Sequence, residues 1–95
     1  MAVTILIKRK VTTSAEAGLD FLLRKLRSLT VNQKGYLSGQ SFRRVDQDEE
    51  SLVISNWQSL GDWERWTASP ERVELQNEID LLVGDPTQYE IYESV

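Results

Sequence analysis

The order in which two kinds of hydrophobic periodicity alternate along the chain constrains its fold more than any other feature. Apolar residues recur at every second position in four segments and at every third or fourth position in the segments between them. The first kind is typical of strands and the second of amphipathic helices. The expected strands are 2–10, 36–45, 51–57 and 87–92, and the expected helices are 13–29, 58–68 and 70–83.

Short local signals mark where these elements begin and end. Thr13 and Glu16 fit a capping box ahead of the leucine stripe of the first helix. Ser69, followed by proline at the first helical position, divides the later helical region into two helices. Gly84 suits the position just after the last helix. The acidic residues of 46–50 favour an exposed hairpin loop between two antiparallel strands.

This order predicts a single domain over residues 1–95 of the α+β class. The expected architecture is a ferredoxin-like βαββαβ split antiparallel sheet with the helices packed on one face. We expect the helix-covered face to carry Val3, Ile5, Ile7, Leu52, Ile54, Tyr89 and Ile91. We expect the opposite face to carry Leu6, Phe42, Val53, Trp57 and Tyr92.

The opposite face of the predicted sheet is too apolar for a surface that simply meets water. An antiparallel sheet with one wet face normally shows clean polar alternation on that face. Two copies that packed these faces together would hide several large side chains, each worth roughly 1.5–3 kcal/mol of transfer free energy. We therefore predict a homodimer, and the alternative is a monomer with scattered apolar surface residues.

The composition excludes several classes of function. The chain contains neither cysteine nor histidine. It therefore has no disulfides, no zinc-finger ligands and no cysteine–histidine or serine–histidine nucleophile pair. The carboxylates of the second half form no metal-like cluster, and no flavin or nicotinamide motif is present. We expect neither a metal nor a cofactor.

The charge is distributed unevenly between the two halves of the chain. Residues 1–47 carry nine Lys or Arg and three Asp or Glu, a balance of +6, whereas residues 48–95 carry two and twelve, a balance of −10. The basic residues are spread over three predicted elements and accompany no nucleic-acid motif, so we expect no nucleic-acid partner. The apolar run of 3–7 is too short to span a membrane and precedes its basic residues, unlike a secretory signal. We therefore expect a cytoplasmic protein without a membrane partner.

The segment from the third strand into the next two helices resembles a known family. Its tryptophan and serine spacing matches a W-x-S-x-x-x-[FW]-x-x-W-x-x-S pattern that is typical of antibiotic biosynthesis monooxygenases. The glycine and tyrosine that open the second strand and the tyrosine-rich last strand are also similar. The matching residues are Asn56-Trp57-Gln58-Ser59-Leu60, Asp62-Trp63-Glu64-Arg65-Trp66, Ser69-Pro70-Glu71-Arg72, Gly35-Tyr36 and Tyr89-Glu90-Ile91-Tyr92.

The resemblance runs over nearly the whole chain and implies a dimeric α+β barrel. It also implies cofactor-free oxygenation, in which a deprotonated polyphenolic substrate passes an electron to O2. A heme-degrading branch of the superfamily uses a first-strand asparagine, a helix tryptophan and a histidine ten residues further on. Trp66 occupies the tryptophan position, but Gln76 stands at the histidine position and the first-strand position falls near Ile7 and Lys8. Heme degradation by that route is therefore not favoured.

Five residues are candidates for lining a ligand pocket: Trp66, Asn56, Gln76, Tyr36 and Lys8. Trp66 would form a pocket wall, or else it fills the core between helix and sheet as we expect of Trp63. The two amides would orient a ligand oxygen, or else they pair with nearby backbone. Tyr36 and Lys8, together with Arg43, would supply a proton-accepting or anion-binding group, unless they are solvated strand residues.

Three hypotheses about function follow from these observations, and the least favoured is a heme-binding or heme-degrading protein. The first is a homodimeric, cofactor-independent monooxygenase-like protein that acts on or binds a small aromatic or quinone-type compound. The second is a non-catalytic homodimer with the same fold that binds a ligand or another protein. The sequence identifies neither the substrate nor the catalytic base.

Overall fold

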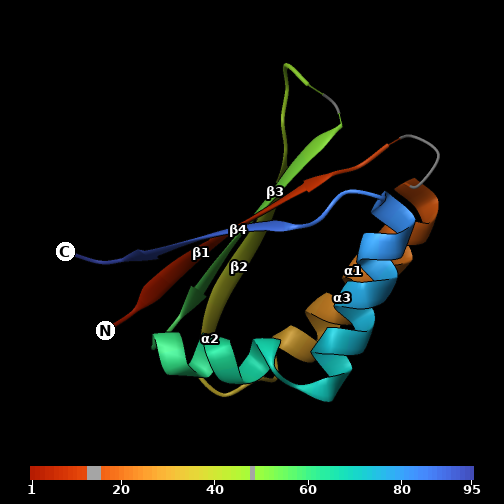
Figure 1. Cartoon of the computed structure of the whole chain (residues 1–95). Coiled ribbons are helices and arrows are strands. Elements are labelled where there is room, and N and C mark those ends of the chain that lie inside the picture. The colour runs from red at the N-terminus through yellow and green to blue at the C-terminus, as the bar shows by residue number, and fades with distance from the viewer. Residues whose placement is uncertain (13–15, 48) are drawn as a thin grey trace.

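The computed structural model describes residues 1–12, 16–47 and 49–95, and in this part of the chain a four-stranded antiparallel sheet carries three helices on one side (Figure 1). The strand order across the sheet is β2-β3-β1-β4. The predicted ferredoxin-like α+β fold is confirmed. The elements are β1 Val3–Lys10, α1 Glu16–Thr30, β2 Tyr36–Arg43, β3 Glu50–Trp57, α2 Leu60–Thr67, α3 Pro70–Val83 and β4 Gln88–Glu93.

The ends of α2 and α3 follow from local side-chain chemistry. Ser59 precedes α2, and its hydroxyl accepts a hydrogen bond from the backbone N–H of Asp62 at 3.1 Å. Ser69 caps α3 in the same way, and Gly84 ends that helix with a left-handed φ of 83°. The predicted capping box of Thr13 and Glu16 depends on groups outside the described residues. No helix in the described part of the chain is both long and apolar enough to cross a membrane.

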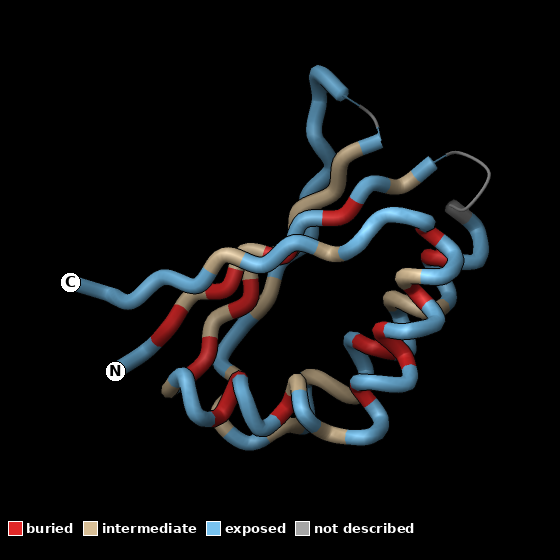
Figure 2. Tube along the Cα trace, viewed as in Figure 1, coloured by how far each residue is buried: buried red, intermediate tan, exposed pale blue. Residues whose placement is uncertain are grey.

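The core lies between the sheet and the helices. Alternate residues of β1 are buried, so this strand presents Val3, Ile5 and Ile7 to the helices (Figure 2). The helices meet this face with leucine, isoleucine and tryptophan side chains at helical spacing. The buried apolar residues are Val3, Ile5, Ile7, Leu19, Leu26, Trp57, Trp63, Trp66, Leu75, Ile79 and Val83.

The predicted assignment of β3 residues to the two faces of the sheet is wrong. In the observed register Ile7 pairs with Val53 and Val3 pairs with Trp57, so Val53 and Trp57 share the helix-covered face. Leu52 and Ile54 therefore lie on the open face. The physical reason is that both phases of β3 are apolar, so alternation along the strand does not indicate which phase faces the helices.

Gly35 joins α1 to β2 in a conformation that few other residues adopt. Its φ of 86° lies in the left-handed region, and a Cβ at this position would overlap the carboxylate of Asp62. The backbone carbonyl of Gly35 also accepts a 2.7 Å hydrogen bond from the N–H of Gln58. The loop after α1 is thereby held against the start of α2.

We expect Gly35→Ala to lower the free energy of unfolding by about 2–4 kcal/mol, because the left-handed conformation and the contact with Asp62 both oppose a side chain. Urea denaturation followed by circular dichroism measures this loss. Gly61→Ala is the matched control, since its Cβ would make only an ordinary contact and alanine favours the helix. An equal effect of the two substitutions would contradict this account.

Candidate functional site

A cavity of about 350 Å³ lies between the helix-covered face of the sheet and the three helices. Its volume falls within the roughly 300–1,000 Å³ that is typical of small-molecule sites. Strands and helices far apart in the chain contribute to its wall. The lining residues are Ile7, Arg9, Asp20, Leu23, Arg24, Leu26, Arg27, Thr30, Tyr36, Gly39, Gln40, Ser41, Val53, Ser55, Trp63, Trp66 and Arg72.

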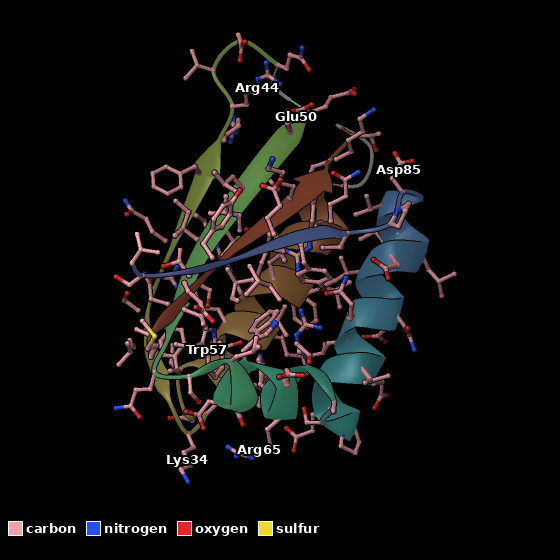
Figure 3. All side chains as sticks on the ribbon, turned by 60° about the vertical axis from the view of Figure 1, so that its left-hand side comes forward. Lys34, Arg44, Glu50, Trp57, Arg65 and Asp85 are labelled. Carbon is pink, nitrogen blue, oxygen red and sulfur yellow. The ribbon has the colours of Figure 1, made fainter. Side chains whose placement is uncertain are left out.

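Aromatic rings form one side of this cavity. Trp63 and Trp66 lie three residues apart on α2, so both point from one face of that helix towards the sheet. Both are buried, yet both contribute to the cavity wall. Trp57 lies behind them where β3 meets α2, and its ring contacts Trp63 edge-on at 5.7 Å between centroids (Figure 3). The ring of Trp57 therefore supports the Trp63 side of this wall.

Trp57 is a core residue and does not lie on the open face where we had expected it. Its side chain has no exposed surface, and its indole N–H donates a 2.8 Å hydrogen bond to the hydroxyl of Ser55. Its ring also meets Tyr36 at 5.5 Å, in an edge-to-face arrangement. It therefore supports the cavity from beneath.

Tyr36 brings a phenol to the cavity. A Cβ at Gly39 would lie 2.6 Å from the hydroxyl of Tyr36, so the absence of a side chain at Gly39 leaves room for this group. Among the described residues, none forms a side-chain hydrogen bond with that hydroxyl. The phenol therefore has a donor and an acceptor to offer to a ligand oxygen.

Two arginines that the sequence analysis did not select also reach the cavity. Arg9 is 4 % exposed and continues the buried phase of β1 after Ile7. Arg72, in the first turn of α3, is equally buried and donates a 2.9 Å hydrogen bond to the hydroxyl of Tyr89. The alternation along β1 could have identified Arg9, because it occupies the same side of the strand as Val3 and Ile7. A charged residue on the buried side of a strand is uncommon.

Burial lowers the pKa of the Arg9 guanidinium from its ordinary value, and the positive charge of Arg72 lowers it further, whereas Tyr89 and Asp80 act in the opposite direction. The guanidinium of Arg72 lies 5.4 Å from the ring centroid of Trp63 and 5.6 Å from that of Tyr89. Such cation–π contacts stabilise a desolvated guanidinium. Arg72 is thereby better compensated than Arg9.

Gln76 is buried and connects Arg9 to the end of α3. Its amide oxygen accepts a 3.3 Å hydrogen bond from Arg9, and its amide nitrogen donates to Asp80 at 2.9 Å and to Thr87 at 2.8 Å. Both ends of the amide are therefore engaged within the chain. This arrangement does not favour Gln76 as a ligand for heme iron.

Asn56 and Lys8 lie on the open face of the sheet, apart from Trp66 and Tyr36. The amide of Asn56 accepts a 2.7 Å hydrogen bond from Thr4 and donates one of 3.0 Å to Ser38. Lys8 forms a 3.0 Å ion pair with Glu90 on the neighbouring strand. The structure thus brings two of the five predicted pocket residues together in the cavity, Trp66 and Tyr36.

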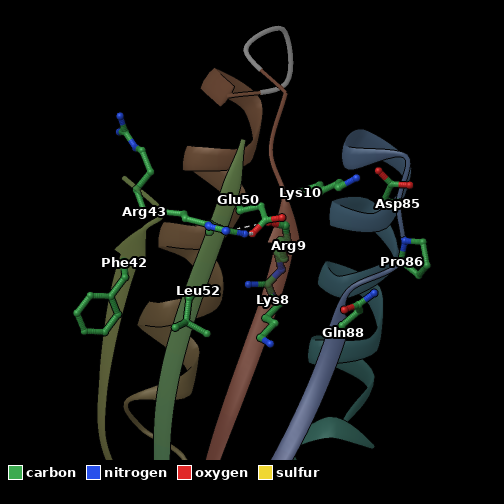
Figure 4. A pocket seen from close by; sticks show the side chains of 12 residues that line it. Lys8, Arg9, Lys10, Phe42, Arg43, Glu50, Leu52, Asp85, Pro86 and Gln88 are labelled. Carbon is green, nitrogen blue, oxygen red and sulfur yellow. Dashed lines mark hydrogen bonds and ion pairs between the residues drawn. The ribbon is translucent and has the colours of Figure 1, made fainter. Parts of the chain in front are cut away.

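A second hollow, of about 620 Å³, lies on the open face near the tip of the β2–β3 hairpin (Figure 4). Lys8, Leu52 and Phe42 line it, from β1, β3 and β2. Arg44 is held nearby by hydrogen bonds to Asp46 and Glu50, which raise its pKa above the ordinary value. This hollow has no aromatic wall comparable to that of the smaller cavity, so we place the candidate site in the smaller cavity.

The described residues contain no group of three or more Asp, Glu, His or Cys side chains placed to hold a metal ion. The donors around the cavity are instead guanidinium groups, a phenol and serine hydroxyls. Such groups bind and orient an oxygen-bearing ligand by hydrogen bonds and charge.

The comparisons with known proteins agree with this fold. The family model for antibiotic biosynthesis monooxygenases matches residues 2–78, so the chain belongs to that family. No curated protein matches the chain.

Solved structures are similar to the chain over nearly its full length. A conserved protein from Methanosarcina mazei Go1 has a TM-score of 0.92 and 16% identity, with 100% of this chain and 94% of that chain covered. SnoaB, a cofactor-independent oxygenase from Streptomyces nogalater, has a TM-score of 0.85 and 16% identity, with coverage of 99% and 93%. Rv0793 from Mycobacterium tuberculosis has a TM-score of 0.88 and 16% identity, with coverage of 100% and 96%. At this identity the likeness concerns the fold.

Proposed function

We propose that this protein is a homodimeric, cofactor-independent monooxygenase-like protein that binds a small aromatic or quinone-type compound beside Trp66 and transforms it. The observation that carries the proposal is the cavity walled by Trp63 and Trp66, with the phenol of Tyr36 beside it, in a member of the monooxygenase family. Flat aromatic walls favour a flat aromatic ligand, because ring contacts add to the burial of apolar surface.

In the proposed reaction the substrate itself supplies the electrons. A bound phenolic substrate loses a proton to solvent, and the resulting anion passes one electron to O2, which is the oxidant. The substrate radical and superoxide then combine to a protonated peroxide, and loss of water leaves one oxygen atom on the ring as a carbonyl. The chain contributes the aromatic wall of Trp63 and Trp66, which shields one side of the bound ring from water, and the hydroxyl of Tyr36, which hydrogen-bonds the substrate oxygen. The likeness of the fold to SnoaB is consistent with this chemistry.

The open face of the sheet supports the homodimer. Its apolar side chains come from all four strands: Leu6, Phe42, Leu52, Ile54 and Tyr92. Phe42 is 42 % exposed and Tyr92 is 53 % exposed in the single chain. Leu6 and Ile54 are paired directly at the centre of the two inner strands. A second copy that packed the same face against this one would bury these side chains in a two-fold interface.

Oxygen uptake with a panel of anthrones and hydroquinones tests the proposed reaction. We expect the wild-type protein to consume O2 above the rate of an unfolded control. We expect Tyr36→Phe to lower that rate about tenfold or more, because a hydrogen-bonding group at the reacting oxygen is removed. Tyr92→Phe, which removes a hydroxyl on the other face of the sheet, is the matched control and should retain the activity.

The same panel separates the two functions. Quenching of tryptophan fluorescence reports binding, since Trp63 and Trp66 both line the cavity. Quenching without oxygen uptake for any member of the panel would contradict the oxygenase and favour a non-catalytic ligand-binding protein of the same fold.

A further inference from the structure

Arg9 carries a buried donor that the described residues do not satisfy. The Nε atom of Arg9 is buried, and no hydrogen-bond partner for it exists within the described part of the chain. Its terminal nitrogen reaches only the amide oxygen of Gln76, at 3.3 Å. A buried guanidinium is costly unless it is paired and hydrogen-bonded, and an orphaned donor on a charged group adds to that cost.

The surroundings of Arg9 leave its charge poorly compensated. Arg72 repels it from the neighbouring wall of the cavity. The carboxylate that attracts it is that of Asp80, which already accepts hydrogen bonds from Gln76 and from Thr87. Tyr89 contributes a phenol, which is engaged by Arg72. No carboxylate among the described residues forms an ion pair with either buried arginine.

The cavity as a whole is cationic, although the chain has a net charge of −4. Its described lining includes four arginines and a single acidic residue: Arg9, Arg24, Arg27, Arg72 and Asp20. Asp20 is neutralised by Arg24 at 3.1 Å near the exposed rim. The excess positive charge is therefore greatest at Arg9 and Arg72, which are the buried members.

We infer that the ligand of this cavity is an aromatic anion, with a carboxylate or phenolate oxygen bound by Arg9 beside Arg72 and its ring against Trp63 and Trp66. The inference rests on the proposed function and names the class of its substrate. An anionic oxygen in the cavity beside Arg9 would compensate its buried charge and offset the repulsion between the two guanidiniums. For a phenolic ligand, the same charge would favour loss of the phenol proton.

Binding of a matched pair of probes tests the inference on the whole protein. Tryptophan quenching is titrated with 2-naphthoate and with 2-naphthamide, which share a ring system and differ in charge. We expect the naphthoate to bind about tenfold or more tightly than the naphthamide at low ionic strength, because charge-assisted hydrogen bonds are the stronger ones. In a second arm, 4-nitrophenol below its solution pKa should show the phenolate absorption band when it is bound.

Three variants locate the effect. Arg9→Met removes the charge and retains the length, and it should bring the naphthoate and naphthamide affinities within about threefold of each other. Arg9→Lys should retain part of the preference for the anion. Lys25→Met removes an exposed positive charge on α1 that does not line the cavity, and it should leave that preference unchanged.

The stability of Arg9→Met separates ligand binding from a structural role. If Arg9 serves the ligand, Arg9→Met without ligand should melt at or above the temperature of the wild type, because a poorly compensated buried charge has been removed. A lower melting temperature, together with an unchanged preference for the anion, would overturn the inference in favour of a structural arginine.

The wild-type titrations alone distinguish the remaining outcomes. Equal affinity for naphthoate and naphthamide, with no phenolate band from bound 4-nitrophenol, would overturn the anion site while leaving the aromatic cavity of the proposed function intact. Failure of both aromatic probes to quench the tryptophans would contradict the proposed aromatic site itself. A phenolate band with 4-nitrophenol and no preference for naphthoate would restrict the site to phenolates.

Discussion

Ile54→Lys is expected to produce a folded chain that sediments as a 10.9 kDa species, whereas the wild-type chain sediments at about twice that mass. Ile54 lies on the central strand β3 and pairs with Leu6 of β1 and Gln40 of β2 on the open face. In a two-fold dimer this face meets its own copy, so the substitution introduces two lysines at the centre of the interface.

The expected loss of dimer affinity is large. An unpaired charge buried in an interface makes the free energy of association less favourable by about 2–5 kcal/mol. A loss of about 3 kcal/mol already raises the dissociation constant of the dimer more than a hundredfold. Sedimentation at several concentrations measures the dissociation constant, and circular dichroism checks that the monomer is folded. Leu81→Lys is the matched control, because Leu81 is 85 % exposed on α3. A wild-type chain that remained at 10.9 kDa at every concentration would overturn the dimer.

Trp57→Ala is expected to lower the free energy of unfolding by about 3–5 kcal/mol. Trp57 has no exposed surface, and its ring contacts Tyr36 and Trp63 while its N–H is hydrogen-bonded to Ser55. Its removal leaves a cavity beneath the tryptophan wall and orphans a buried hydroxyl. Domains of this size are stable by only about 5–15 kcal/mol, so much of the stability would be lost.

Urea denaturation of Trp57→Ala and Trp57→Phe measures this effect. Phenylalanine fills part of the space that alanine leaves empty, so we expect Trp57→Phe to lower the free energy of unfolding less than Trp57→Ala does. Some loss should remain, because phenylalanine lacks the N–H that donates to the hydroxyl of Ser55. The slope of free energy against urea should be unchanged if both variants unfold in one cooperative step. A loss below about 1 kcal/mol for Trp57→Ala would show that Trp57 is not a central packing residue.

Much of the fold could be predicted because the responsible forces act over a few residues. Alternation along 3–10 specifies a strand, and the leucine stripe after Glu16 specifies a helix, without reference to the rest of the chain. Ser69 and Gly84 mark the ends of α3 by hydrogen bonds to residues three or four positions away. The order of these elements leaves few ways to form one sheet, which is why the ferredoxin-like topology was predictable.

The candidate site was less predictable because it depends on contacts between distant segments. Of the predicted pocket residues, Trp66 and Tyr36 meet in the cavity, whereas Asn56 and Lys8 lie on the opposite face of the sheet. Gln76 is engaged by its own neighbours. The face on which a β3 residue lies depends on its pairing with β1, and both phases of β3 are apolar.

Local patterns in the sequence specify the kind, number and order of the elements and the two ends of α3, and the composition excludes cysteine and histidine chemistry. The packing of the helices on the sheet, in contrast, is what brings Arg9 and Arg72 into the lining of one cavity and places Trp57 in support of its wall. Periodicity and helix capping depend on residues a few positions apart, so they can be read from a short segment. Strand register and helix packing depend on distant segments, and they bring the charges of Arg9 on β1 and Arg72 on α3 close enough to repel each other.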